Sequence, residues 1–311
     1  MNVVPKLTPS GRLRLTFGMV PVSEDARTRV HLGDFCALLG KGLDAVIVPH
    51  RAPSPLALAS AMQTGRVHIA WLSPTLLITS GGPAGVLPLV SSVRQGVTVY
   101  HAVLFVATGS RVQRIEDLSR ARAAWVAPTS ASGYLFSRLA LARRGLDLAT
   151  LFDVETFYDT HGRAAAAVLD GRADVGATFA VYEGGDPTRS LVRAGFSDVI
   201  PGLTARIIDV AGPIPADMIV TVPGVPLPVR SALTVALRRI GDDPTAREPL
   251  RALFGVDSFR PFSSASLRSL VDLGAELAGP ASASVPALRP QPSIPPPAAP
   301  RHPRPPPPHR S

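Results

Sequence analysis

One arrangement occurs twice in this chain: the end of a helix, a Gly-Arg turn and then a buried strand. It lies at residues 59–70 and again at 166–177. Gly65 and Gly171 stand where a helix closes in the left-handed backbone conformation, which glycine adopts without a steric penalty. Because each turn leads directly into an apolar strand, the pair is typical of two similar α/β lobes. The alternative is that a common helix-to-strand connection occurs twice by chance.

Strands and helices alternate through most of the sequence. This alternation predicts an α/β fold with parallel sheets. A chain of 311 residues is long enough for two domains, and it has no run of about 20 apolar residues of the kind that crosses a membrane. The apolar patterns predict strands at 13–18, 44–49, 68–72, 100–106 and 123–126, and helices at 31–39, 54–62 and 134–145.

The formal net charge of +9 lies partly in the C-terminal segment 280–311. That segment is rich in Pro and Ala and contains no acidic residue, so we expect it to be disordered or polyproline-like. A Pro/Arg-rich tail of this kind suits a partner domain with an aromatic groove. Elsewhere the arginines are scattered without interleaved aromatic residues, which argues against nucleic-acid binding.

A Ser/Thr-rich loop at 127–133 connects a predicted strand to a predicted helix. Three hydroxyl side chains, Thr129, Ser130 and Ser132, are followed by Gly133. The first N–H groups of a helix have no partner within it, and the helix dipole places partial positive charge there. We expect these hydroxyls and the amides of Ser132 and Gly133 to hold an oxyanion, such as a phosphate, phosphonate, sulfate or carboxylate. The alternative is that Ser130 or Ser132 simply caps the helix.

Four segments follow one another in an order that is typical of a known family. Residues 65–74 read Gly-Arg-Val-His-Ile-Ala-Trp-Leu-Ser-Pro, and 128–134 read Pro-Thr-Ser-Ala-Ser-Gly-Tyr. Residues 160–175 give a His, a helix and a Gly-Arg-Ala-Asp-Val turn, and 212–217 read Gly-Pro-Ile-Pro-Ala-Asp. Together, across about 17–253, they resemble the substrate-binding receptors of phosphonate and phosphite ABC importers, in the type II periplasmic-binding-protein superfamily.

This resemblance implies an α/β fold of two lobes joined by a hinge, with a ligand trapped between them when they close. The chain would begin in lobe one, build lobe two, and return to finish lobe one. The implied divisions are a leader at 1–11, lobe one at 12–103 and 206–279, lobe two at 104–205, and a disordered Pro/Arg-rich tail at 280–311.

The resemblance also implies ligand contacts outside the loop. Tyr100 stands where the family has a ligand-contacting tyrosine, although a strand tyrosine half in the core is an equal alternative. His161 would donate a ring N–H to the anion, or else cap a helix. Asp217 stands where the family recognises a substrate ammonium group, or else stabilises a turn. Arg51 lies in a loop that lacks the family's tyrosine, which favours a more anionic ligand, and His68 replaces an Asp of the family motif.

We therefore expect a non-catalytic protein that captures a small oxyanion, a phosphonate, phosphite or phosphate ester, for ABC-type import. It would act as a monomer with membrane subunits of an importer, without a metal or a cofactor. One alternative is a cytosolic enzyme on the same fold, similar to the menaquinone-pathway proteins. Another is an intracellular ligand-sensing or docking subunit. The sequence has no nucleophile motif, and its single cysteine, Cys36, is expected to be buried in a helix.

The first residues do not read as a secretion signal, because residues 1–10 contain one lysine, two prolines and no apolar run. As it stands, the sequence favours a cytoplasmic protein, whereas the family resemblance implies the periplasm.

Overall fold

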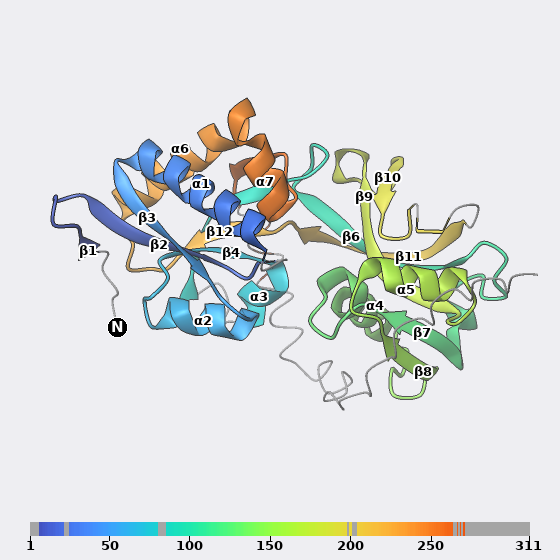
Figure 1. Ribbon diagram of the computed structural model, residues 1–311. Helices are drawn as coiled ribbons and strands as arrows, with labels where there is room; N and C mark the ends of the chain where they lie inside the picture. Colours follow the sequence, from blue (N-terminus) through green and yellow to red (C-terminus); the bar gives the residue numbers. More distant parts are fainter. Residues whose placement is uncertain are drawn as a thin grey trace, which may run out of the picture.

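The chain folds into two α/β lobes, each built on its own β-sheet (Figure 1). The computed structural model describes residues 6–21, 25–79, 85–197, 199–200, 204–263, 266, 268 and 270. Within these residues, no helix has both the length and the apolar character needed to cross a bilayer. The predicted tail at 280–311 lies outside the described residues.

The first lobe contains a seven-stranded sheet in the order β1-β2-β4-β12-β5-β13, with β3 also paired to β2. β2, β3 and β4 are parallel, and the other strands join them antiparallel. Helices α1, α6 and α7 lie on one face of the sheet, and α2 and α3 lie on the other (Figure 1). The elements are β1 (Lys6–Leu7), β2 (Leu13–Met19), α1 (Ala26–Leu43), β3 (Ala45–Arg51), α2 (Pro55–Gln63), β4 (Ile69–Leu72), α3 (Pro74–Thr79), β5 (Leu87–Val93), β12 (Met218–Thr221), α6 (Leu227–Asp242), a 3-10 turn (Pro244–Ala246), α7 (Arg247–Phe254) and β13 (Ser258–Pro261).

The second lobe contains a six-stranded sheet in the order β11-β6-β9-β7-β8, with β10 on β9. Successive side chains of β6 point to opposite faces of this sheet. Leu104 and Val106 pack on the face covered by α4, whereas Phe105 packs on the face covered by α5. The elements are β6 (Val99–Ala107), a 3-10 turn (Ile115–Leu118), β7 (Ala121–Trp125), a π-helical turn η3 (Ala131–Leu135), α4 (Phe136–Arg143), β8 (Phe152–Phe157), α5 (His161–Leu169), β9 (Val175–Tyr182), a 3-10 turn (Glu183–Gly185), β10 (Leu191–Ala194) and β11 (Ala205–Pro215).

The chain passes between the lobes twice, from β5 to β6 and from β11 to β12. β6 and β11 pair antiparallel from Ala205 opposite Ala107 to Pro215 opposite Val99. The two crossings therefore lie side by side, and only short connections link the sheets. This is the geometry of a hinge, because a few residues at the ends of strands can absorb the rotation of one lobe against the other.

The predicted internal repeat is present in the backbone. Each lobe contains a β-α-β-α-β unit with parallel strands, in the spatial order β3-β2-β4 in the first lobe and β8-β7-β9 in the second. Gly65 and Gly171, which close the second helix of each unit, both have positive φ, 70° and 81°. The similarity of the two segments is therefore structural and not a chance echo.

Several expected boundaries differ from the structure. The lobe divisions expected at 103/104 and 205/206 fall within β6 and β11, which pair with each other in the second-lobe sheet. The helix predicted at 31–39 is α1, which continues past Gly40 to Leu43. Gly40 does not end the helix. It lets α1 approach β3, since a Cβ there would lie 2.7 Å from the Ala45 carbonyl oxygen. The leader expected at 1–11 is not separate from lobe one, because Lys6 and Leu7 pair with β2. Cys36 is buried in α1, as predicted.

Candidate functional site

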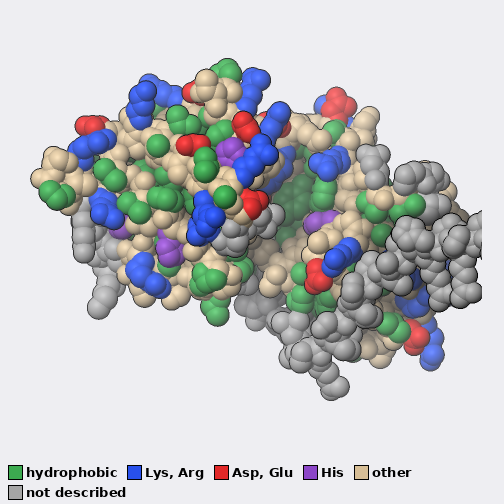
Figure 2. Space-filling view, in the orientation of Figure 1, with side chains coloured by type: hydrophobic (Ala, Val, Ile, Leu, Met, Phe, Trp, Pro, Cys, Tyr) green, Lys and Arg blue, Asp and Glu red, His purple; other side chains and the backbone are tan. Residues whose placement is uncertain are grey.

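A cleft of about 700 Å³ lies between the two lobes at the crossing strands. Figure 2 shows it as a hollow with apolar side chains in its depth and Lys and Arg side chains along the rim of the first lobe. Ligand sites commonly occupy such concave surfaces between domains. Six of the predicted site residues line the cleft: Tyr100, Thr129, Ser130, Ser132, His161 and Asp217.

The Ser/Thr-rich loop leads from β7 into a helix that begins earlier than predicted. The helix opens with the π-helical turn η3, in which the Leu135 N–H donates to the Ser130 carbonyl at 3.0 Å. Ser130 is its N-cap, and its Oγ accepts from the Gly133 N–H at 3.1 Å. Of the two candidate capping serines, Ser130 takes that role and Ser132 does not.

Gly133 does not join the cleft, contrary to the prediction that its amide contacts the ligand. Its N–H is bound by Ser130, and the residue is buried against the preceding strand. A Cβ at this position would overlap the Val126 side chain. The glycine is therefore required so that the helix can start close to β7, and its role is packing.

Several donors in the loop remain available to a ligand. Among the described residues, the N–H groups of Ala131 and Ser132 and the hydroxyls of Thr129 and Ser132 have no hydrogen-bond partner. Ser132 is only 3% exposed, yet it lines the cleft. A nearly buried polar group without a protein partner is costly unless something else satisfies it. The start of this helix is thus suited to an anion.

His161 is the first residue of α5, and its ring lies beside this loop in the cleft lining. Thr160 caps the helix, so His161 itself is not needed as the cap. Nδ1 of His161 is 2.8 Å from the Thr178 Oγ1, and the ring packs edge-on against Phe179. Burial lowers the pKa of His161 to about 4. The imidazole is therefore neutral at physiological pH, and its second nitrogen can serve as a hydrogen-bond donor.

Tyr100 and Asp217 stand at the lobe crossing. Tyr100 lies on β6, half-buried beside Ile214, and burial raises the pKa of its hydroxyl, with the Asp217 charge adding to the effect. The Asp217 carboxylate does not stand alone, because Arg94 Nη2 donates to its Oδ2 at 2.6 Å. The expected ammonium-binding carboxylate is already paired with a guanidinium in this structure.

Arg51 is not brought to the cleft. It ends β3, a strand at the side of the first-lobe sheet, and it is absent from the lining of the cleft. The inference from Arg51 to a more anionic ligand therefore has no geometric basis here. Three other arginines line the cleft instead: Arg94, Arg193 and Arg251.

Two first-lobe residues that were not predicted from the sequence also line the cleft. Ser73 follows β4, and its Oγ accepts from the Leu76 N–H at the start of α3. Thr75 lies beside it, and both line the cleft. The signal was present: Ser73 follows its strand as Ser130 follows β7, and the carboxyl ends of parallel strands meet at the ligand-binding edge of an α/β sheet.

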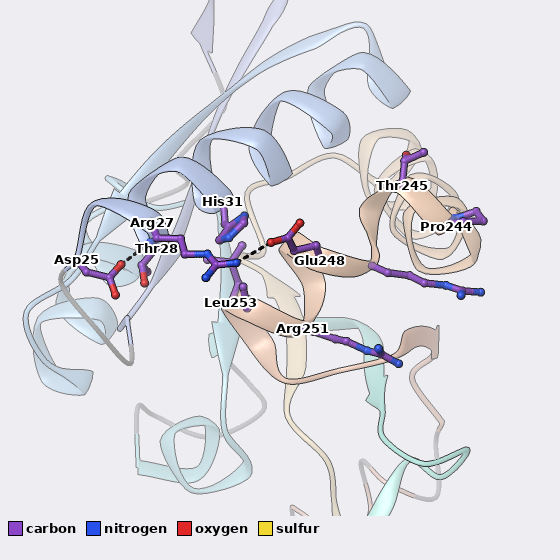
Figure 3. Close-up of a pocket in the computed structure, with 11 residues that line it drawn as sticks. Asp25, Arg27, Thr28, His31, Pro244, Thr245, Glu248, Arg251 and Leu253 are labelled. Carbon is purple, nitrogen blue, oxygen red and sulfur yellow. Dashed lines mark hydrogen bonds and ion pairs between the residues drawn. The ribbon is translucent and has the colours of Figure 1, made fainter.

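A larger hollow, of about 860 Å³, lies within the first lobe between the start of α1 and α7 (Figure 3). Arg27 from α1 reaches Glu248 from α7 across it at 2.8 Å, and His31 lies next to this ion pair. Its lining comes from one lobe only, so closure of the lobes cannot enclose a ligand there. We therefore place the functional site in the interlobe cleft. No group of His, Cys, Asp and Glu side chains suited to a metal ion occurs among the residues that the structure describes.

Comparison with known proteins agrees with this architecture. Residues 17–267 match the model of a protein family described as "ABC transporter, phosphonate, periplasmic substrate-binding protein". Among solved structures, XAC2383 from Xanthomonas citri, bound to ATP, superposes with a TM-score of 0.66 at 22% identity, covering 84% of this chain and 96% of that one. A binding protein component of an ABC phosphonate transporter from Pseudomonas aeruginosa gives 0.59 at 17% identity, covering 88% and 89%. PhnD1 from Prochlorococcus marinus, in complex with methylphosphonate, gives 0.59 at 15% identity, covering 85% and 98%.

Proposed function

Because the chain belongs to the family of phosphonate periplasmic substrate-binding proteins of ABC transporters, we propose that its interlobe cleft captures a small ligand through a tetrahedral oxyanion. Family membership makes it a solute-binding protein of ABC import, with a small molecule as ligand and membrane subunits of a transporter as partners. Our proposal concerns the chemistry of that ligand and the residues that hold it.

The observation that carries the proposal is the set of unpartnered donors at the start of η3. The amides of Ala131 and Ser132 and the hydroxyls of Thr129 and Ser132 come from one short segment and open on one cleft. Hydrogen bonds to a charged group contribute roughly 1.5–3 kcal/mol each, and micromolar affinity corresponds to about 8 kcal/mol. Four or five such bonds are enough for capture without a metal, even after the cost of closing the lobes.

The neighbouring side chains add to this site without competing for it. The neutral His161 ring is anchored through Nδ1 to Thr178. In the tautomer with the proton on Nε2, this second nitrogen can donate a hydrogen bond to the ligand. On the opposite wall, Ser73 and Thr75 come from the first lobe. Closure about the two crossing strands would bring these hydroxyls toward the loop and enclose the anion from both sides.

The ligands of two similar structures are consistent with an oxyanion. XAC2383 is bound to ATP and PhnD1 to methylphosphonate. Both molecules carry tetrahedral phosphorus bonded to anionic oxygens, although they differ greatly in size. This shared group supports a phosphonate, phosphite or phosphate ester as the ligand class for this chain.

The enzyme alternative gains no support from the site. A His161 paired with a carboxylate would favour acid–base chemistry, but within the described residues its ring nitrogen bonds to Thr178. Transport by a non-catalytic receptor therefore remains the proposal. The monomeric state and a partner domain for the segment 280–311 remain predictions from the sequence.

The sharpest test is Ser132→Ala, measured by titration calorimetry with methylphosphonate, phosphate and phosphite. Ser132 makes no side-chain hydrogen bond within the described protein, so its removal leaves the fold intact. Loss of one bond to a charged ligand weakens binding by about tenfold to a hundredfold. Ser60→Ala is the matched control, because Ser60 is an exposed serine on α2, outside the cleft.

Ser130→Ala needs separate interpretation, since it also removes the cap on Gly133 and costs about 1 kcal/mol of stability. An unchanged affinity in Ser132→Ala, at an unchanged melting temperature, would refute the assignment of the anion site. Absence of heat with every tetrahedral oxyanion would refute the ligand class.

A further inference from the structure

We propose that the cleft selects ligands whose oxyanion carries an uncharged substituent, and that the Arg94–Asp217 ion pair excludes ligands bearing an ammonium group. The inference rests on the proposed function, and it names the class of ligand within it. Arg94 affects ligand choice through Asp217, because it holds and neutralises that carboxylate. Nothing in the sequence pattern around Arg94 indicates this role.

Arg94 is held in place from several sides. Its Nη2 donates to the Asp217 Oδ2 at 2.6 Å and to the Phe254 carbonyl at 2.9 Å, and its Nε donates to the Gly255 carbonyl at 3.1 Å. Asp217 is fixed as well, because its carbonyl accepts from both the N–H and the hydroxyl of Ser92. The ion pair is therefore preformed, and a ligand cation would have to displace an anchored guanidinium to reach the carboxylate.

The second carboxylate of the cleft is also occupied. Asp257 accepts from Arg251 Nη2 at 3.2 Å through one oxygen and from the Gln95 N–H at 2.8 Å through the other. Asp217 and Asp257 are the acidic residues in the lining. Among the described residues, an ammonium group in the cleft thus finds no carboxylate that lacks an arginine partner.

The third arginine leaves an excess of positive charge. Arg193 on β10 lines the cleft from the second lobe, and its side chain has no hydrogen bond or ion pair with any described residue. Three guanidinium groups therefore face two carboxylates, and each carboxylate is paired with one of them. This balance attracts an anion and repels a second cation on the ligand.

The remaining wall suits an apolar substituent. Val97, Val99, Phe179 and Val181 line the cleft beyond the Ser/Thr-rich loop. A volume of about 700 Å³ exceeds what a bare oxyanion needs, so the site has room for an organic group against these side chains. The observations together favour an alkyl-substituted oxyanion over an ω-amino one.

The test uses two phosphonates of the same size, propylphosphonate and 2-aminoethylphosphonate, which differ by a methyl in place of an ammonium. Titration calorimetry on the full chain should show the wild type binding propylphosphonate at least tenfold more tightly. Arg94→Gln removes the charge that neutralises Asp217, and it should reduce this preference at least tenfold or reverse it. Arg94→Lys keeps a positive charge near Asp217, and it should retain the wild-type preference.

Since both Arg94 variants lose contacts to main-chain carbonyls, Asp217→Asn provides an independent measurement. If Asp217 is unavailable to the ligand, this variant keeps the preference for propylphosphonate. A wild type that prefers 2-aminoethylphosphonate, with that preference lost in Asp217→Asn, would overturn the inference and leave the oxyanion site intact. Failure of both phosphonates and of inorganic phosphate to bind would instead overturn the proposed function, and the inference with it.

Discussion

The two lobes make the same helix-to-strand connection with different chemistry. In the first lobe, the Thr16 N–H donates to Nδ1 of His68 at 3.1 Å, and the His68 N–H returns a bond to the Thr16 carbonyl. In the second lobe, the Arg122 N–H donates to the Asp174 carboxylate at 2.9 Å, and the Asp174 N–H returns a bond to the Arg122 carbonyl. His68 thus links the start of β4 to β2, and Asp174 links the start of β9 to β7.

The difference lies in how the acceptor is balanced. Asp174 is charged, and the Arg122 side chain forms an ion pair with it at 3.0 Å. His68 is an uncharged acceptor, and its partner in the neighbouring strand is a threonine. Both lobes therefore place a side-chain acceptor at the same point of the repeat, and whether that acceptor is charged depends on the residue across from it.

These two connections matter for the cleft because the strands that follow them carry its walls. β4 leads to Ser73, and β9 carries Thr178, Phe179 and Val181. If one of these connections loosened, the strand that follows it would shift, and the cleft residues on that strand would shift with it. Stability at the turns and affinity in the cleft should therefore change together.

Removal of the charged acceptor should have the largest effect. Asp174→Ala leaves the Arg122 N–H without its acceptor and breaks the ion pair, and we expect a loss of about 2–3 kcal/mol from hydrogen bonds to a charged group. Urea unfolding followed by fluorescence measures it. Glu116→Ala is the control, because its carboxylate is 68% exposed and faces Arg114 at 3.7 Å, where an ion pair contributes about 0–1 kcal/mol. Equal losses in the two variants would contradict the role assigned to Asp174.

Exchange of the acceptors should have an intermediate effect. His68→Asp places a carboxylate at a buried site opposite Thr16, whose side chain carries no positive charge, and we expect a loss of about 1–2 kcal/mol. The double variant Thr16→Arg with His68→Asp copies the second-lobe pair and should recover much of that loss. A double-mutant cycle measures the coupling directly. If the coupling is zero, the two turns are similar in backbone only, and the balance of charge is irrelevant.

The repeat and most of the cleft residues could be predicted from the sequence. The predictions that failed did so for physical reasons. Gly65 and Gly171 mark the turns because their backbone conformation excludes most other residues. Ser132 could be found because it stands between a recognisable strand and a recognisable helix, whereas His161 was implied by the family resemblance. Arg94 and Arg193 could not, since their roles depend on segments far away in the sequence. The prediction for Gly133 failed because the spacing of the loop does not show that this glycine is packed against Val126.

The smallest effect should appear in the pH dependence of the two connections. Burial lowers the pKa of His68 below its ordinary value of 6.5, so the unfolded chain takes up a proton more readily than the folded one. Stability from this group is therefore present at neutral pH and lost as the pH falls through 6.5 toward the folded pKa. The pKa of Asp174 is lowered chiefly by the Arg122 hydrogen bond, so its contribution persists until the pH falls below 3.8.

Between pH 6.5 and 4, acid should thus weaken the first-lobe connection while the second remains intact. Melting temperatures of the wild type and of His68→Asn across this range measure the difference, because an asparagine oxygen can accept from Thr16 without titrating. His161, whose pKa burial lowers to about 4, adds a similar slope to both proteins and cancels in the comparison. The wild type should lose up to about 1 kcal/mol more than the variant, the net strength of one neutral hydrogen bond. Parallel pH profiles for the two proteins would mean that His68 titrates alike in the folded and unfolded chain, which would contradict the lowered pKa.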